Sequence, residues 1–438
     1  MSVTMLQEWK EYTLKELADP LDKFSFKGGP FGSDLKSSHY TDAGVRVLQL
    51  QDIGEGAFLN KSDVYTSNET ADGLLACNIF PGDILLAKMS PVARCCIVPE
   101  QDERYVMCSD GIRLSVDKQR FDRDYVFYAL NDVAFRKKAE ALSTGTTRAR
   151  IGLSDLKALS IFCPSKLEQQ KIAEVLSTVD QKIELIDKKI TETQKLKTGL
   201  MQKLFSEGVG VQGEDGNWLP HTKFKDSKLG RIPDSWCLGA IKDISPLQGG
   251  YAFKSKSATD SGVRWLKIAN VGKRRVTWNN DSYLPETFID EHSDFLLNEG
   301  DIVIALTRPV LSGDLKVARL SDKDVPALLN QRVARVNIND DVADPGFVYY
   351  LFEDKRMASN ISKVILGTDP PNISTKQIES FDIAIPPLEE QKSIRKVLSS
   401  VSAKINLLMQ QKTETQLLKK GLMQKLLTGE WRVPLDNH

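Results

Sequence analysis

The chain repeats itself at a distance of about 220 residues, and this repeat limits what it can fold into. Residues 191–204 (TETQKLKTGLMQKL) and 413–426 (TETQLLKKGLMQKL) are identical at 12 of 14 positions, at an offset of 222. The same offset aligns Gly145-Thr146 with Gly367-Thr368, and an offset of 218 aligns Gly82-Asp83 with Gly300-Asp301. One unit of structure therefore occurs twice in the chain.

The similarity between the two copies is uneven along the repeated unit. Segments of about 40 residues are near copies, whereas the parts of about 150 residues that precede them share only scattered positions. The sequence therefore predicts an internal pseudo-twofold repeat in which a duplicated scaffold carries two different globular heads. Two equal surfaces suit two copies of one partner, and two unequal surfaces suit two ligands or the two parts of one asymmetric ligand.

The near-copied segments have the sequence pattern of long helices. Apolar residues recur at 3–4 spacing over residues 172–204 and 394–426, which is a 3.5-residue period over more than four heptads. A proline precedes each segment and a glycine follows it, as expected at helix ends. About 38 helical residues would extend roughly 57 Å. We expect the two helices to form an antiparallel coiled coil, because a folded head lies between them. The alternative is two separate amphipathic helices, each packed on its own head.

The heads have a mixed α+β pattern. Short β-like runs occur at residues 45–50, 83–87, 301–305 and 333–337, and helical patterns cover residues 125–141 and 347–363. The predicted order is a first head (1–163), a first spacer helix (164–207), a linker (208–235), a second head (236–385), a second spacer helix (386–428) and a tail (429–438).

Composition excludes several classes of protein. The 59 basic and 59 acidic side chains balance, so charge alone does not predict a nucleic-acid binder. Without an uninterrupted run of 18 apolar residues or an apolar leader, we expect no membrane span and a cytoplasmic protein. Six cysteines in a chain of this length indicate reduced thiols rather than a disulfide framework.

The sequence shows no catalytic or metal-binding motif. The four histidines are scattered, and phosphate-binding glycine loops and the G-x-S-x-G elbow are absent. Residues 369–372 (DPPN) resemble the Asp-Pro-Pro-aromatic motif of amino-methyltransferases but lack the aromatic residue, so a turn is the preferred interpretation. A stand-alone methyltransferase therefore has no support in the sequence, and we expect no enzyme and no metal site.

Several of the repeated motifs together resemble the specificity subunit of type I restriction-modification enzymes. The residues concerned are the P-x-x-x-E-Q motif that opens each helical segment at Pro164 and Pro386, GLMQKL near the end of each segment, and residues 229–236 (LGRIPDSW) and 427–433 (LTGEWRV). The resemblance covers essentially the whole chain.

The resemblance implies a function and a set of partners. Each head would be a target recognition domain that reads one half of a bipartite, asymmetric sequence in double-stranded DNA, and the helices would set the gap between the halves. Two methylation subunits and two restriction (motor-nuclease) subunits would bind the chain. S-adenosylmethionine, ATP and magnesium would belong to those partners, which methylate adenine or cleave DNA. The alternative is a tandem protein-interaction scaffold that binds no nucleic acid.

Candidate DNA contacts are basic and polar residues in loops next to the predicted strands, because arginine and amide side chains read base edges and lysines contact phosphates. In the first head they are Ser33, Lys36, Lys88, Arg94, Thr146, Thr147, Arg148 and Arg150. In the second head they are Lys254, Lys256, Lys273, Arg274, Arg275, Arg308, Lys316, Thr368 and Asn372. For Arg148 and Arg150 and for residues 273–275, a solvated surface without a ligand is the alternative. Candidate contacts to the methylation subunits are Gln202, Lys203, Gln424 and Lys425.

Overall fold

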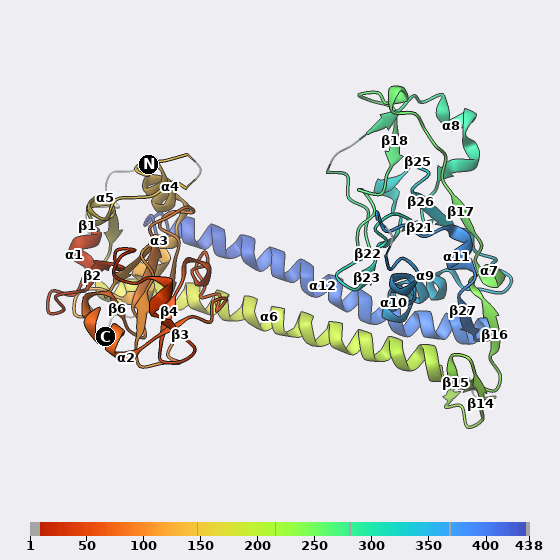
Figure 1. The fold of residues 1–438 in the computed structure, drawn as a ribbon, viewed down its shortest axis with the longest axis horizontal. Helices are drawn as coiled ribbons and strands as arrows, with labels where there is room; N and C mark the ends of the chain where they lie inside the picture. Colours follow the sequence, from red (N-terminus) through yellow and green to blue (C-terminus); the bar gives the residue numbers. More distant parts are fainter. Residues whose placement is uncertain (1–8, 147, 215, 280–281, 368, 435–438) are drawn as a thin grey trace. The chain divides into compact units, whose positions relative to one another are not determined.

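The computed structural model describes residues 9–146, 148–214, 216–279, 282–367 and 369–434. The chain forms two compact units, residues 1–187 with 410–438, and residues 188–409. Each unit contains one head, the beginning of one long helix and the end of the other (Figure 1).

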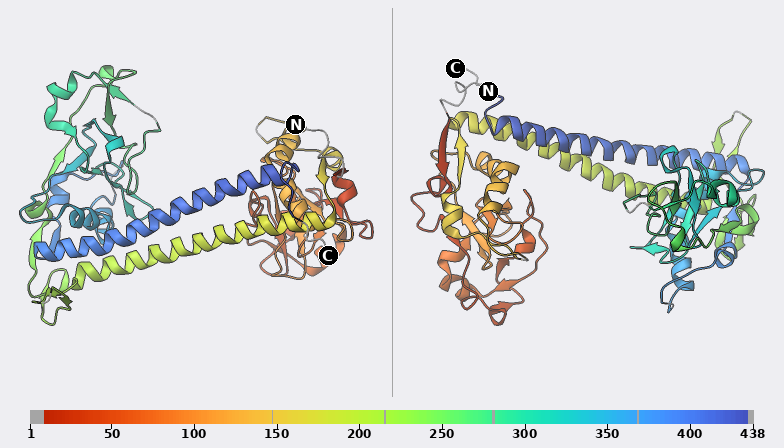
Figure 2. Two further views of the ribbon diagram at one scale, coloured as in Figure 1. Left: turned by 180° about the vertical axis from the view of Figure 1, so that it is seen from behind. Right: turned by 90° about the horizontal axis from the view of Figure 1, so that it is seen from above.

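The near-copied segments form two long helices, α6 (Lys166–Glu207) and α12 (Leu388–Leu426), which run side by side (Figures 1 and 2). In the first unit, Asp180 pairs with Lys419 at 2.6 Å and Asp187 pairs with Lys412 at 2.7 Å. From the first ion pair to the second, the residue number increases in α6 and decreases in α12, so the helices are antiparallel. The predicted pairing of the helices is confirmed, and the alternative of two separate helices is wrong.

The P-x-x-x-E-Q motif joins each head to the long helix that follows it. In the first unit, the Gln169 side chain accepts from the amide of Asp122 and donates to the carbonyl of Pro164, both at 2.9 Å. Gln391 makes the same two bonds in the second unit, to Asp344 and Pro386. The glutamine thus fixes the start of the helix against its head.

The glutamate of this motif binds the segment that follows the other long helix. Buried Glu390 accepts hydrogen bonds from Trp236 Nε1 at 2.8 Å and from the amide of Val209 at 3.0 Å, and it contacts His221 Nε2 at 3.0 Å. Buried Glu168 forms a bidentate pair with Arg432 of the tail, at 2.5 and 2.8 Å. A buried carboxylate needs such partners, which explains why glutamate stands in both copies.

Both heads are mixed α and β, as predicted. The first head has a four-stranded antiparallel sheet and a second sheet in which one pair of strands is parallel. The four-stranded sheet contains β2 (Phe26–Gly28), β10 (Gly111–Leu114), β7 (Ile84–Ala87) and β8 (Cys95–Ile97). The second sheet contains β3 (Tyr40–Thr41), β5 (Tyr65–Thr66), β4 (Val45–Leu48), β9 (Tyr105–Met107) and β6 (Asn78–Ile79).

The second head repeats this arrangement, except that its second sheet has, among the described residues, no strand equivalent to β3. Its first sheet contains β17 (Leu247–Gly249), β26 (Val333–Val336), β21 (Ile302–Ala305) and β24 (Val317–Arg319). Its second sheet contains β19 (Tyr283–Leu284), β18 (Val263–Leu266), β25 (Ala327–Leu329) and β20 (Leu296–Leu297). The parallel pair of strands has the same position in the second sheet of each head: β4 with β9 in the first head, and β18 with β25 in the second. This agreement confirms the predicted internal repeat.

A two-stranded pair closes each head next to its long helix. The pairs are β1 (Lys10–Thr13) with β11 (Ser160–Cys163), and β16 (Cys237–Ala240) with β27 (Asp382–Ile385). Short helices complete the heads: α1 (Leu14–Leu17), α2 (Asn68–Gly73) and α5 (Leu153–Ala158) in the first, and α7 (Ile241–Ile244), α8 (Phe288–Glu291) and α11 (Thr375–Glu379) in the second. A small hairpin, β22 (Val310–Leu311) with β23 (Asp314–Leu315), is added in the second head.

The stretches expected to be single helices are each divided in two. The first head has α3 (Arg123–Asn131) and α4 (Val133–Ala141), and the second has α9 (Pro345–Glu353) and α10 (Lys355–Val364). An aspartate with extended backbone stands at each break, where the side chains of Asp132 and Asp354 accept from the amides two residues on. The prediction was wrong here because the aspartates act as N-caps of new helices rather than as solvated helical residues.

Residues 208–235, expected to be a linker, form two β-hairpins where the structure describes them. They are β12 (Val211–Gln212) with β13 (Trp218–Leu219), and β14 (Phe224–Ser227) with β15 (Gly230–Pro233). In the described part of the chain, no helix has both the length and the apolar character needed to cross a lipid bilayer.

Candidate nucleic-acid interface

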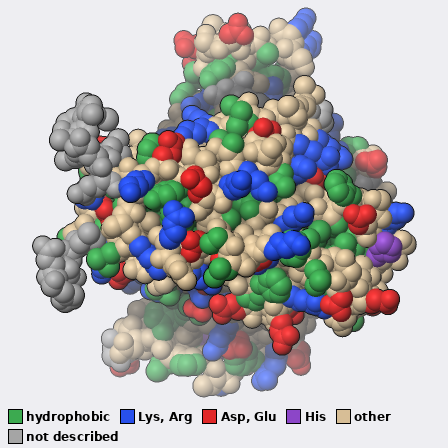
Figure 3. Space-filling view, turned by 90° about the vertical axis from the view of Figure 1, so that its left-hand side faces the viewer, with side chains coloured by type: hydrophobic (Ala, Val, Ile, Leu, Met, Phe, Trp, Pro, Cys, Tyr) green, Lys and Arg blue, Asp and Glu red, His purple; other side chains and the backbone are tan. Residues whose placement is uncertain are grey.

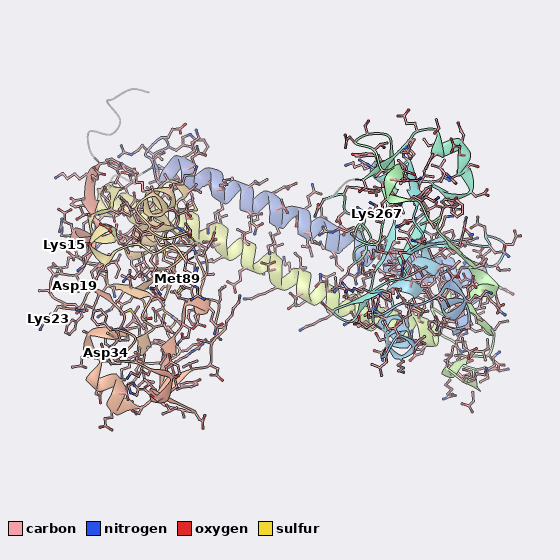
Figure 4. All side chains as sticks on the ribbon, turned by 45° about the horizontal axis from the view of Figure 1, so that its top comes forward. Lys15, Asp19, Lys23, Asp34, Met89 and Lys267 are labelled. Atoms are coloured by element: carbon pink, nitrogen blue, oxygen red, sulfur yellow. The ribbon has the colours of Figure 1, made fainter. Side chains whose placement is uncertain are left out.

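Three of the predicted loops meet at one end of the four-stranded sheet in the first head. The amide of Lys88, directly after β7, donates to the carbonyl of Asp110 at 2.7 Å, and Ser90 donates to Ala149 at 2.9 Å. Gly29, directly after β2, donates to Gly111 at 2.8 Å. The described residues of the loops at 29–36, 88–94 and 144–151 thus form one surface, which we call the strand-end surface. Figure 4 labels Asp34 and Met89, which belong to two of these loops.

The second head builds the same surface with equivalent hydrogen bonds. Leu306, directly after β21, donates to Arg332 at 2.9 Å, and Arg308 donates to Pro371 at 2.7 Å. Gly250, directly after β17, donates to Val333 at 3.1 Å. Three segments therefore meet in both heads, which sequence alone did not establish. They are the loops that begin at Gly28-Gly29 and Gly249-Gly250 (the Gly-Gly loops), the loops after β7 and β21, which follow the Gly-Asp-Ile runs at 82–84 and 300–302, and the segments after Gly145 and Gly367.

Glycine is required where the Gly-Gly loops pass closest to the neighbouring loop. A Cβ atom at Gly29 would lie 1.8 Å from the carbonyl oxygen of Cys108, and one at Gly250 would lie 2.3 Å from that of Asn330. Neither backbone atom can move aside as a side chain could, so these glycines fix the packing of the surface.

Most candidate residues of the first head lie exposed on this surface. The segment that follows Gly145 carries Thr146, Arg148 and Arg150, and the first loop carries Ser33 and Lys36. Lys88 is half-buried. Phe31 of the first loop is 82% exposed and was missed, because an apolar residue gives no sign in the sequence that it lies on the surface. Thr147 and Thr368, two further candidates, lie outside the described residues.

In the second head the equivalent surface carries exposed Lys254, Lys256, Arg308 and Asn372. Arg308 has a left-handed backbone conformation, with φ of 47°. The Asn372 side chain is occupied, since Oδ1 accepts from Thr307 Oγ1 at 2.5 Å and Nδ2 donates to the carbonyl of Pro370 at 3.0 Å.

Arg94 and Lys316 connect the loops of the heads internally. The Arg94 guanidinium donates to the carbonyls of Ile53 and Leu50 at 2.7 and 2.8 Å, and Lys316 Nζ donates to the carbonyl of Ile268 at 2.9 Å. Burial lowers the pKa of both side chains, and in Arg94 the nearby Arg136 lowers it further. This geometry gives both residues a role in positioning the loops.

The basic run at residues 273–275 lies beside the long helix α6 in the second unit. Lys273 pairs with Asp314 at 3.0 Å, and Arg274 pairs with Glu353 at 2.7 Å. Buried Lys197 of α6 also contacts Glu353, at 2.6 Å. Burial lowers the pKa of Lys197, and the negative charge of Glu353 opposes that shift. Arg275 is exposed. The densest basic cluster of the second head is thus largely neutralised by acidic neighbours.

Equivalent grooves lie where each head meets the end of the long helix that bears GLMQKL. In the first unit, a groove of about 600 Å³ is lined by Met423 and Gln424 of α12 and by residues of α3 and α4. In the second unit, a groove of about 310 Å³ is lined by Met201 and Gln202 of α6 and by residues of α9 and α10. The two candidate glutamines therefore occupy matching positions. The candidate lysines lie elsewhere on the helices, with Lys203 exposed and Lys425 paired with Glu430.

Charges of both signs cover the face of the first unit that Figure 3 presents, where Lys and Arg side chains lie among Asp and Glu. This agrees with the zero net charge of the chain. Within the described residues, no group of three or more His, Cys, Asp or Glu side chains could hold a metal ion.

The profile of one protein family, described as the type I restriction modification DNA specificity domain, matches residues 7–195 and 233–417. The chain belongs to this family. It is a specificity subunit of a type I restriction-modification system, and it determines recognition of the DNA target. Specificity subunits are non-catalytic, and the catalytic cofactors belong to the methylation and restriction subunits. The subunit acts in a complex with DNA and other subunits, so the scaffold hypothesis without nucleic acid is set aside.

Several specificity subunits are similar to this one. The type I restriction enzyme MjaVIII specificity subunit of Methanocaldococcus jannaschii is 34% identical over 328 residues, which are 75% of each chain. The crystal structure of the type I restriction-modification system S subunit from M. genitalium has a TM-score of 0.56 at 19% identity, covering 97% of this chain and 98% of that one. A structure addressing complex assembly and conformational transition of the type I R-M system has a TM-score of 0.57 at 15% identity, covering 96% and 98%.

Proposed function

We propose that the two heads of this specificity subunit read the two different halves of a bipartite, asymmetric DNA target. The observation that carries this proposal is the strand-end surface, which has the same backbone in both heads and different side chains at matching positions. The same frame with different side chains suits two readers of different base sequences. Methylome sequencing of a host that carries the system tests the proposal, with a motif of two unlike halves expected.

The proposed DNA contacts follow from where the structure places the candidate residues. Side chains on the strand-end surfaces would read bases or contact nearby phosphates: Ser33, Lys36, Lys88, Thr146, Arg148 and Arg150 in the first head, and Lys254, Lys256, Arg308 and Asn372 in the second. Thr147 and Thr368, which lie outside the described residues, stay proposed contacts from the sequence alone. Exposed Arg275 would contact phosphate, with Lys273 and Arg274 holding its loop through their acidic partners. Arg94 and Lys316 would support the loops from inside.

The long helices would act as the spacer between the two readers. They pair in an antiparallel manner, and each head is fixed to the start of a helix by Gln169 or Gln391. We keep the division into a first head (1–163), a spacer helix (164–207), a connecting segment (208–235), a second head (236–385), a spacer helix (386–428) and a tail (429–438). The gap between half-sites would then depend on helix length.

The partners in this proposal are two methylation subunits, which modify adenine, and two restriction subunits. Support comes from the paired grooves beside Gln202 and Gln424 and from the 12 identical positions of 14 around them. An apolar seam alone would not preserve exposed glutamines. Since its substrate is DNA in the cell that makes it, the complex would work in the cytoplasm.

Native mass spectrometry should show two methylation subunits on each wild-type chain. Gln424→Arg places a bulky charge in the groove of the first unit and should leave one bound subunit, and Gln202→Arg should do the same in the second unit. The double variant should bind none. Gln181→Arg, an equally exposed change on α6 away from both grooves, is the control and should still bind two. A wild-type complex that saturates at one subunit per chain would contradict the proposal.

A further inference from the structure

The strand-end surface of the first head presents an arginine that is held by an acid. Arg150 Nη2 lies 3.1 Å from Asp110 Oδ2, while the Arg150 side chain remains 54% exposed. A guanidinium held on one side by a carboxylate keeps its remaining donors in a fixed plane. This is the arrangement that suits two parallel hydrogen bonds to O6 and N7 of a guanine in the major groove.

Backbone pairing identifies the equivalent positions in the second head. In the first head the amide of Lys88 donates to the carbonyl of Asp110, and in the second head the equivalent amide of Leu306 donates to the carbonyl of Arg332. Arg332 therefore matches Asp110. A bridge joins Met89 to Arg150 where another joins Thr307 to Asn372, so Asn372 matches Arg150. The first head thus has its arginine at position 150 and the partner, Asp110, on the neighbouring loop. The second head has its arginine, Arg332, at the position of Asp110 and the partner, Asn372, at the position of Arg150.

Arg332 is exposed and is supported by neutral oxygens. Its Nη1 atom lies 3.3 Å from Thr307 Oγ1 and 3.4 Å from Asn372 Oδ1. Thr307 and Arg332 occupy both lone pairs of the Asn372 amide oxygen, so this oxygen has no lone pair left to accept from the amino group of an adenine. Arg332, whose side chain contacts Asn372 itself, offers a fork-shaped donor at this position, beside the candidate Arg308.

We propose that Arg332 is a specificity-determining residue of the second head, which reads a guanine in its half-site as Arg150 does in the first. The inference rests on the proposed function, since it assumes that each head reads one half-site. It adds a residue that was absent from the sequence candidates, and it assigns the same base chemistry to arginines from different segments of the two heads, Arg150 before α5 and Arg332 directly before β26.

The test is methylation of duplexes that differ from the target at one base pair, using the complex with its methylation subunits. Arg332→Ala should lose roughly 5- to 150-fold of the discrimination at one guanine position of one half-site and keep discrimination in the other. Arg332→Lys keeps the charge but not the planar fork, so it should bind DNA well and lose part of the same discrimination. Arg150→Ala should do this at one position of the opposite half-site.

Arg319→Ala is the matched control, because Arg319 is also exposed on this sheet but pairs with Ile302, at the opposite end of β21. It should leave discrimination unchanged. If Arg332→Ala bound all duplexes equally less well, Arg332 would contact phosphate only. If its discrimination were unchanged, Arg332 would make no DNA contact. Either outcome overturns the inference but leaves the bipartite target in place. Retained discrimination at the other positions of the second half-site shows that the second head of the variant is folded. A wild-type motif without two halves would instead overturn the proposed function.

Discussion

Exchanging the first head for that of another specificity subunit should change one half of the DNA target and leave the other half as it was. Residues 14–159 are the segment to exchange, because β1 and β11 on either side pair with each other and keep the joint to α6 intact. Each mismatched base pair costs about 1–3 kcal/mol, so three changed base pairs would reduce methylation of the old target by a factor of at least about 100.

The reciprocal exchange is the control for this experiment. Replacing residues 241–381, which lie between β16 and β27, should change only the other half-site. Methylome sequencing of both hybrids gives the two motifs directly. If either exchange altered both half-sites, the heads would not be independent readers.

Lengthening both long helices by four residues should widen the gap in the target by one or two base pairs. Repeating residues 186–189 after Lys189 and residues 408–411 after Gln411 adds the residues next to the ion pair of Asp187 with Lys412. Four residues add about 6 Å and about 40° beyond a full turn. The added length equals nearly two base-pair steps of about 3.4 Å, and the added rotation about one step of roughly 35°.

A two-residue insertion at the same places separates length from phase. It would rotate each helix by about 200° and turn the apolar seam away from its partner, so methylation should be lost. Ile186 and Ile190 are four residues apart in the apolar seam, and the four-residue repeat adds one more step of that length. The apolar residues therefore still face the partner helix. A four-residue variant that methylates its target with an unchanged gap would show that the helices do not set the spacing.

The long-range organisation of this chain could be predicted from its sequence because the same residues recur at a constant offset in the two halves. The match of residues 191–204 with 413–426 indicated two equal helices, and the Gly-Asp-Ile runs marked the strands that carry the strand-end surface. Periodicity and repetition can be read directly from the order of residues, and the structure confirmed the paired helices and the internal repeat.

Side-chain partners were beyond such reasoning. Arg94 and Lys316 have the appearance of surface cations in sequence, yet their donors are taken up by carbonyls of a loop more than 40 residues away. Arg332 was missed because its counterpart is an acid, so comparing the two copies gave no match. Asp132 and Asp354 interrupt helical patterns as caps, which depends on backbone geometry that periodicity does not report.

The wild-type methylation motif tests the central claim most directly, because it reports what the two heads read together. Methylome sequencing of a host with the intact system should give two specified half-sites of different sequence, separated by a fixed run of unspecified base pairs, with a methylated adenine in each. A single uninterrupted motif, or two identical half-sites, would contradict the account of two unlike readers on one duplicated scaffold.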